Sequence, residues 1–320
     1  MPVRFTSPGL GGRRDGFLQA HEWEVGAYFR RLTADEWFVG RKINEAAAPF
    51  GKPLYLDINS LDLSLAYGLT SRASITVTIP FSSGTHSRLY ADQVRHKVAA
   101  RGLGDINAIA STWLRDPGSS SAGNIALGIG LKAPTGNNRV EDDFFAADGS
   151  VSRRVVDQAI QLGDGGWGVI VQSQGYRRLS ERLNAYAFGS YLVTPKRKTE
   201  VPSPLTGVTL SVPDVYSVRA GVAYALIPSR PLTASLGARI DGIPLRDLVG
   251  GGDDGFRRPG HTLFLDPGVS LRIGRHELTT SVPIRLRENF SRSLIDRERG
   301  LIGGGDLARY LVFAGYTVRL

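Results

Sequence analysis

Alternation of apolar and polar residues is the feature that most constrains how this chain can fold. In residues 216–226 (YSVRAGVAYAL) every second residue is apolar or aromatic, whereas the residues between them are small, except for Arg219. A period of two predicts a β-strand, because successive side chains of a strand point to opposite faces of a sheet. One face of this strand would be apolar, and the other would carry an arginine.

The same alternation recurs along the chain. It is clear in the segments 73–81, 125–132, 232–241, 263–273 and 277–287. Together with weaker signals elsewhere, it predicts twelve strands, near residues 21–31, 54–69, 72–81, 104–115, 123–134, 166–178, 182–194, 214–227, 231–243, 261–273, 276–288 and 307–320.

The connections between these strands alternate in length. Short links such as 70–71 (TS) and 274–276 (GRH) alternate with long ones such as 32–53 and 135–165. A transmembrane β-barrel has this arrangement, with tight periplasmic turns, long outer loops and an even number of strands. In a bilayer the sheet must also close on itself, because unpaired backbone groups are costly in hydrocarbon.

The sequence therefore predicts an all-β fold, a closed antiparallel transmembrane β-barrel of about twelve strands with short periplasmic turns and long extracellular loops. We expect an N-terminal tail over 1–20 and a single barrel domain over 21–320. A soluble sandwich or propeller would show similar alternation, but the chain lacks a repeat of blade length.

Composition excludes several kinds of site. The 320 residues include no cysteine, so disulfides, thiolate metal sites and cysteine nucleophiles are excluded. The formal net charge is +9, but the basic residues are dispersed and lack the clustered stripe of a nucleic-acid-binding surface. The five histidines show no metal-ligand spacing. We expect no nucleic-acid partner, no metal and no cofactor.

The N-terminal residues MPVRFTSPGLGGRRDG lack the apolar stretch of a signal peptide. For an exported barrel, we therefore expect the printed chain to be a mature or mis-started form. The expected location is the bacterial outer membrane, with outer-membrane lipid as a partner.

Aromatic residues near the strand ends predict two membrane-interface belts. Tyr216 and Tyr224 lie eight residues apart on the apolar face, about 20 Å along the membrane normal for a tilted strand. This is near the separation of the two aromatic girdles of such barrels. The predicted interface aromatics are Tyr67, Phe81, Tyr216, Tyr224, Tyr310 and Tyr316.

Charged residues fall on the opposite, lumen-facing side of the predicted strands. By phase, the predicted pore-lining residues are Lys132, Arg219, Arg239, Asp241, Asp266, Arg272, Glu277, Arg285, Arg287 and Arg309. Two interpretations remain open. The two signs could pair across the lumen and stiffen a narrow barrel, or the arginines could form a basic constriction that selects anionic solutes such as aromatic carboxylates.

The last residues, FAGYTVRL, resemble the terminal signal by which bacterial outer-membrane barrels are recognised for assembly. Gly315, Val318 and Leu320 match its glycine and apolar positions, whereas Phe313 occupies a position that is usually polar and the final residue is Leu instead of Phe. The resemblance implies the barrel-assembly machinery as a partner.

Three internal stretches carry a second resemblance. In order and spacing, GLGDINA (102–108), GIGLKAPTGN (128–137) and QLGDGGWGV (161–169) resemble the outer-membrane transporter-like family named for the meta-cleavage pathway of phenol degradation. Where that family tends to show Gly-Thr-Gly-Ser, this chain has GDGG at 163–166. The resemblance implies a barrel that passes small organic compounds.

The function predicted from these observations is an outer-membrane channel for passive uptake of small organic solutes, either aromatic or anionic, without catalytic residues. One alternative is a lipid-modifying hydrolase of the outer membrane, for which His86 and Ser87 are the candidate pair in a predicted loop. The other is a non-conducting structural barrel. We also expect a short helix over 88–100 and a flexible acidic loop over 250–255.

Overall fold

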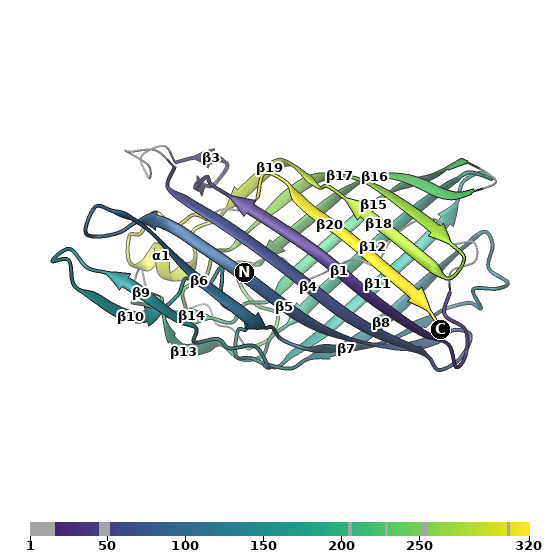
Figure 1. The fold of residues 1–320 in the computed structure, drawn as a ribbon, viewed down its shortest axis with the longest axis horizontal. Helices are drawn as coiled ribbons and strands as arrows, with labels where there is room; N and C mark the ends of the chain where they lie inside the picture. The colour runs from purple at the N-terminus through teal and green to yellow at the C-terminus, as the bar shows by residue number, and fades with distance from the viewer. Residues whose placement is uncertain (1–16, 45–51, 204–206, 228–229, 251–254, 306–307) are drawn as a thin grey trace.

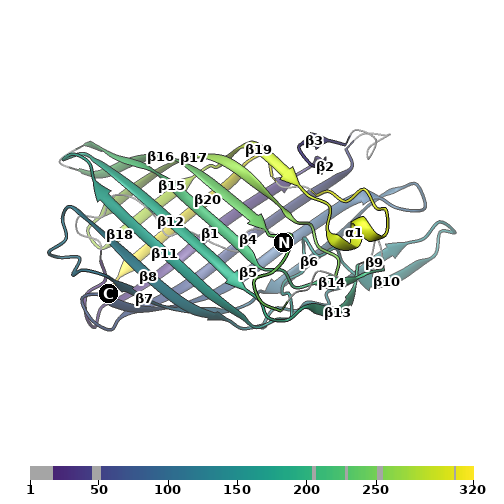
Figure 2. The same cartoon turned by 180° about the vertical axis from the view of Figure 1, so that it is seen from behind.

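The computed structural model describes residues 17–44, 52–203, 207–227, 230–250, 255–305 and 308–320. Most of the predicted tail and the centre of the 250–255 loop lie outside these residues. Within the described ranges, twelve antiparallel strands form one closed barrel with steeply tilted strands (Figures 1 and 2). The prediction of a closed antiparallel barrel of about twelve strands is confirmed.

Each wall strand pairs with the next one along the chain, and the last pairs with the first. The wall consists of β1 (Trp23–Ala34), β4 (Leu54–Gly68), β5 (Ala73–Leu89), β7 (Asn107–Trp113), β8 (Gly123–Lys132), β11 (Gly168–Arg178), β12 (Leu183–Val193), β15 (Val215–Ile227), β16 (Arg230–Ile243), β17 (Gly260–Ile273), β18 (His276–Ser281) continued by β19 (Ile284–Phe290), and β20 (Leu311–Arg319). Nine residue pairs join β1 to β20, so the sheet closes.

The long connections gather at one end of the barrel. There lie β2 (Phe38–Val39), β3 (Lys42–Ile43), β9 (Glu141–Phe145), β10 (Val151–Val155), β13 (Lys198–Pro202), β14 (Thr209–Ser211) and helix α1 (Leu294–Glu298). The C-terminus lies at the opposite, short-turn end (Figure 1). In the part of the chain that the structure describes, no helix has the length and apolar character needed to cross a membrane.

Exposure along β8 shows how the two faces of the wall differ. Ile125, Leu127, Ile129 and Leu131 point outward with 48% to 62% of their surface exposed, whereas Ala126 between them is 1% exposed. Apolar residues thus cover the outside of the barrel, as expected for a wall in contact with lipid.

The outer face of β5 changes character along the strand. It is apolar up to Phe81 and carries Ser83, Thr85 and Ser87 beyond that point. The strand then turns and pairs with β6 (Arg95–Leu103), so the short helix predicted over 88–100 is wrong. Val98 is buried between exposed neighbours, a period of two that pairing with β5 satisfies better than a helix does.

A β-bulge interrupts the alternation in β19. The register shifts between Leu263 and Phe264 of β17, so Arg285 pairs with buried Phe264 whereas Arg287 pairs with Leu263. Arg287 is exposed and lies on the outer face with Leu263, in contrast to its predicted place on the inner face. The extra residue, Leu286, shifts the alternation of β19 by one position, so the residues after it point to the face opposite to the one predicted.

The largest hydrophobic core lies inside the barrel toward the long-loop end. It includes Leu32, Leu56, Ile58, Val98, Val156, Ile160, Phe264 and Leu311. Val156 and Ile160 belong to the connection between β10 and β11, so this loop contributes side chains to the barrel interior.

Gly315 accommodates an inward-facing tyrosine on the neighbouring strand. It pairs with Tyr28 of β1, and a Cβ at position 315 would lie 2.8 Å from the Tyr28 ring and 2.6 Å from Thr279 Oγ1. We predict that Gly315→Ala lowers the free energy of unfolding by about 1–3 kcal/mol, because overpacking displaces these groups. Denaturant unfolding in detergent micelles measures the loss, and adding Tyr28→Ala should recover part of it. An unchanged unfolding midpoint in Gly315→Ala would contradict this account of the glycine.

Candidate functional site in the barrel lumen

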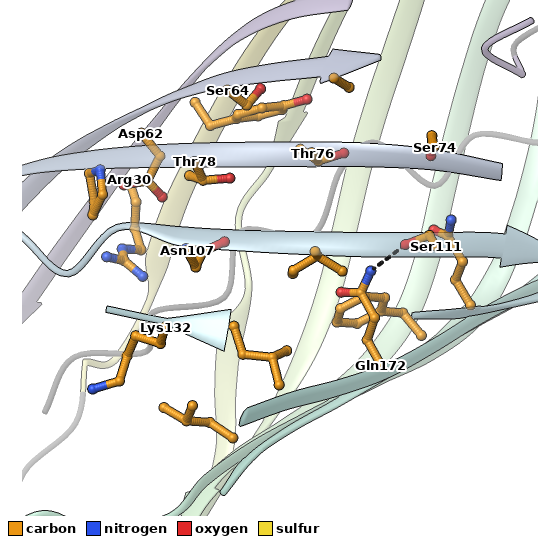
Figure 3. Close-up of a pocket in the computed structure, with 18 of the residues that line it drawn as sticks. Arg30, Asp62, Ser64, Ser74, Thr76, Thr78, Asn107, Ser111, Lys132 and Gln172 are labelled. Carbon is orange, nitrogen blue, oxygen red and sulfur yellow. Dashed lines mark hydrogen bonds between the residues drawn. The ribbon is translucent and has the colours of Figure 1, made fainter. Parts of the chain in front are cut away.

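A cavity of about 280 Å³ lies inside the barrel. Uncharged hydrogen-bonding side chains form much of its lining, among them Ser64, Ser74, Thr76, Thr78, Asn107, Ser111 and Gln172 (Figure 3). Gln172 Nε2 donates to Ser111 Oγ at 3.2 Å, which links β11 to β7 across β8. Apolar side chains also line the cavity, including Ile109, Ile170, Phe188 and Leu192. The charged residues of the lining are Glu24, Arg30, Asp62, Arg72, Asp105 and Lys132.

The segment 156–164, which we call the strap, borders the cavity on the side of the long-loop end. Ile160 and Leu162 of the strap both line the cavity. A Cβ on Gly84 would lie 2.8 Å from Ile160 Cγ2, and one on Gly102 would lie 3.0 Å from Leu162 Cδ1. The strap therefore packs directly against the inner wall, and the glycines provide the room for it.

Phe17 borders the cavity toward the short-turn end. Its ring makes an edge contact with Trp113, at 4.9 Å between centroids, and stacks on Tyr176 at 5.7 Å. It is 8% exposed although it precedes the first strand. Side chains from outside the wall strands thus narrow the lumen on both sides of the cavity.

A buried ion triad fixes one end of the strap. Lys132 Nζ contacts Asp105 Oδ2 at 3.3 Å and also bonds Asp164 of the strap. All three residues are at most 5% exposed. The backbone N–H of Gly136 donates to Asp105 Oδ1 at 3.0 Å and holds that carboxylate in place.

The triad takes one residue from each of the three stretches that carry the family resemblance. Asp105 lies in 102–108, Lys132 in 128–137 and Asp164 in 161–169. The alternation of its strand predicts that Lys132 points into the barrel, but it gives no indication that the two aspartates are its partners. The available signal is the position of the two aspartates. Each lies in a glycine-rich segment that leads into a strand next to the strand of Lys132, namely β7 for Asp105 and β11 for Asp164.

Asp157 fixes the other end of the strap, beyond the apolar band of the wall. Its carboxylate lies 3.7 Å from Arg258 Nη2, and the guanidinium of Arg258 stacks over the ring of Trp37 at 4.3 Å. Burial raises the pKa of Asp157, but the charges of Arg258 and His86 outweigh this effect and lower the pKa to about 2. The strap is therefore anchored at both ends by buried charges.

His86 lies beside this second anchor and does not form a catalytic pair with Ser87. His86 is 6% exposed on the inner face, whereas Ser87 lies on the outer face and pairs with Lys97. Burial lowers the pKa of His86, and Arg88 and Arg258 lower it further, against an opposing effect of Asp157. Within the described part of the chain, no group of three or more His, Asp or Glu side chains is arranged to hold a metal ion.

The predicted lumen residues of β15, β16 and β17 form buried ion pairs. Arg219 Nε lies 2.5 Å from Asp266 Oδ2, and Arg239 Nε lies 2.7 Å from Asp241 Oδ2. All four side chains are at most 7% exposed. The ring of Phe313 covers the guanidinium of Arg239 at 4.7 Å.

The remaining predicted lumen residues lie toward the two ends. Arg272 pairs with Glu277 at 3.0 Å near the short β17–β18 turn. At the long-loop end, Arg285 contacts Glu36 as well as Glu288, the latter at 2.9 Å. Arg309 precedes β20, has a half-exposed side chain and also bonds Glu36.

Apart from Arg287, which lies on the outer face, the predicted charged residues therefore form separate paired groups and no single basic constriction. The structure favours pairing over a ring of arginines that attracts anions. For Glu36, burial raises the pKa but Arg285 and Arg309 outweigh it, so the pKa is lowered.

The predicted interface aromatics fall at two levels on the outer face. Near the short turns, Tyr67 packs on Trp23 at 4.5 Å between centroids and Tyr316 OH bonds His276 Nδ1 at 2.7 Å. Tyr224 lies at the same end and is exposed. Tyr216 stacks on Tyr191 near the long-loop end.

Two more of these aromatics are also exposed on the outside, Phe81 on β5 at 43% and Tyr310 at 49%. In the C-terminal strand, Val318 pairs with Val25 and Leu320 is 63% exposed. Interface and assembly roles for all these residues stay predictions.

Comparison with known proteins identifies similar folds. No family model matches the chain, and no curated protein matches it. A solved outer membrane channel from Pseudomonas putida F1 has 15% sequence identity and a TM-score of 0.64, covering 99% of this chain and 100% of that chain. This likeness shows the barrel fold.

Other solved barrels align with lower scores. The CymD monoaromatic hydrocarbon channel has 10% identity and a TM-score of 0.48, covering 95% of this chain and 89% of that chain. The β domain of the Bordetella autotransporter BrkA has 12% identity and a TM-score of 0.47, covering 94% and 100%.

We predict that Lys132→Met lowers the free energy of unfolding by about 3–5 kcal/mol, because it leaves two buried carboxylates without their cation. Denaturant unfolding in detergent micelles measures this loss. The triple variant Asp105→Asn, Lys132→Met, Asp164→Asn should recover much of it, since the buried charges are gone. Wild-type stability in Lys132→Met would show that the triad does not anchor the strap.

The strap anchor also predicts a pH dependence. The folded pKa of His86 is below its ordinary value of 6.5, so the unfolded chain takes up a proton first and stability falls as the pH drops below 6.5. Asp157, with a pKa of about 2, keeps its charge over this range. Between about pH 7.5 and about pH 5 we therefore expect stability to fall as the pH is lowered. The loss should be smaller in His86→Gln, and equal losses in the two proteins would refute the assignment.

Proposed function

We propose that this protein is a channel of the bacterial outer membrane that admits small, neutral organic solutes passively. The observation that carries the proposal is a closed barrel that is apolar outside and contains a cavity with uncharged hydrogen-bonding groups. The outer face requires an apolar surrounding, and the cavity offers a place for a solute.

The cavity fits a solute that is partly apolar and carries a hydroxyl or similar group. At about 280 Å³ it has room for one small molecule, such as a substituted aromatic ring. Ile109, Ile170 and Phe188 can contact a ring, while Thr76 and Thr78 can exchange hydrogen bonds with a polar substituent. The two hydroxyls are spaced along β5, so a solute can pass from one to the next.

Charge pairing supports neutral rather than anionic solutes. Lys132 and Arg219 lie against carboxylates in the barrel interior, and their charges are balanced locally. A solute carboxylate would have to break such a buried pair, which is unfavourable. The resemblance of three stretches to a family of outer-membrane transporter-like proteins supports the same class of function, and the similar fold serves as an outer membrane channel in Pseudomonas putida F1.

The strap would set the size limit of the channel. Because Ile160 and Leu162 cover the cavity, a solute arriving from the long-loop end has to pass them. We predict that Ile160→Ala with Leu162→Ala speeds swelling of liposomes by neutral aromatic alcohols several-fold. Leu248→Ala, which changes a loop residue that is 70% exposed, should leave the rate unchanged.

The same assay separates the alternatives. Neutral solutes should enter faster than carboxylates of similar size, and the reverse order would refute the neutral-solute proposal. A correctly folded protein that admits neither solute, with or without the strap substitutions, would instead be a non-conducting structural barrel. Folding is checked by the shift between unboiled and boiled samples on gels.

A further inference from the structure

Two rows of residues cross β1, β4, β5 and β6 on the outer face of the barrel. The backbone pairs Phe29 with Leu61, Leu61 with Phe81 and Phe81 with Leu103. These four apolar residues form the first row. The side chains of Phe29, Leu61 and Phe81 are 38% to 43% exposed.

The second row follows immediately toward the long-loop end. Arg31 pairs with Asn59, Asn59 with Ser83, and Ser83 with Arg101. Both arginines are exposed, and two neutral hydrogen-bonding side chains lie between them. The outer face thus changes from fully apolar to polar and cationic between one outward-facing residue of each strand and the next, two positions along the chain.

This change marks the level at which hydrocarbon gives way to lipid headgroups. Beyond it, β4, β5 and β6 continue as a sheet, with Thr85, Ser87 and Lys97 on the same outer face. Figure 1 shows these strands extending together toward the long-loop end. A lipid with its chains on the first row would therefore place its headgroup on the second row and the sheet above.

We propose that this surface binds a phosphorylated disaccharide lipid of the outer leaflet, the chemistry of lipid A. Arg31 and Arg101 are three strand spacings apart, about 14 Å, which suits a disaccharide headgroup with a phosphate at each end. Arginine pairs well with phosphate oxygens. Asn59 and Ser83 between them can hydrogen-bond sugar hydroxyls.

Acidic residues nearby do not cancel this surface. Arg31 Nη2 lies 3.0 Å from Asp57 Oδ2, but both side chains are at least 40% exposed, so the pair contributes little and can open. Among the described residues, no acidic partner of Arg101 is found within ion-pair distance. Asp142 accepts a hydrogen bond from the N–H of Ala99 and pairs with Arg153 at 3.3 Å.

The inference rests on the membrane placement proposed above, but not on transport. It is tested by native mass spectrometry of the detergent-solubilised barrel titrated with diphosphoryl lipid A, monophosphoryl lipid A or phosphatidylglycerol. We expect the wild type to prefer the diphosphoryl form. The double variant Arg31→Gln, Arg101→Gln should bind it about tenfold to thirtyfold more weakly.

A matched control removes the same number of charges at the other end of the barrel. Arg182→Gln with Arg275→Gln changes two exposed arginines near the short turns and should keep wild-type affinity. The single variant Arg101→Gln should show a partial loss without disturbing the Arg31–Asp57 pair.

Equal affinities of the double variant and the control would overturn the site, and so would binding of phosphatidylglycerol as tight as that of diphosphoryl lipid A. Liposome swelling measured on the same preparations keeps the two proposals separate. Lipid binding without swelling would refute the channel and leave the lipid site standing.

Discussion

The cost of an unpaired backbone group in hydrocarbon is the constraint on which the rest of this structure depends. A sheet that meets lipid can satisfy its N–H and C=O groups only by closing. The pairing of β1 with β20 achieves this. Closure then divides every strand into an outer face that must be apolar and an inner face that can hold charge, as the alternation along β8 shows.

Inside the barrel, the consequence is a dense arrangement of paired charges. Arg219 with Asp266 and Lys132 with two aspartates are almost entirely removed from solvent. Such groups are tolerated only in pairs, because a buried charge without a partner is strongly destabilising. Among the hydrogen-bonding side chains that line the cavity, neutral ones outnumber charged ones, and this underlies the proposed preference for neutral compounds.

The sequence predicted the architecture well because alternation is a local property. The strands of the wall, their number and the closed fold could all be inferred from the period of two and from the lengths of the connections. The predictions were wrong where the alternation of apolar and polar residues shifts or where a strand continues beyond its expected end. The bulge at Leu286 moved Arg287 to the outer face, and continued pairing of β5 replaced a predicted helix.

The site was less predictable, since it depends on contacts between distant parts of the chain. The phase placed Lys132 inside, but no periodic signal shows that Asp105 and Asp164 meet it. The strap has no alternation to reveal that Ile160 enters the lumen, and its path became visible only with the wall around it. The functional roles of the lumen, interface and C-terminal residues stay predictions.

The attachment of the strap also has a consequence for the order of assembly. Its anchor points belong to parts of the wall that meet only through sheet pairing: Asp105 precedes β7, Lys132 ends β8, and Arg258 lies just before β17. While these strands are still apart, Asp157 and Asp164 have no cations to bind and remain in water. Both ends of the strap can therefore be docked only once the β7–β8 pair and the start of β17 belong to one wall, so the strap ties together parts of the chain that are distant in sequence.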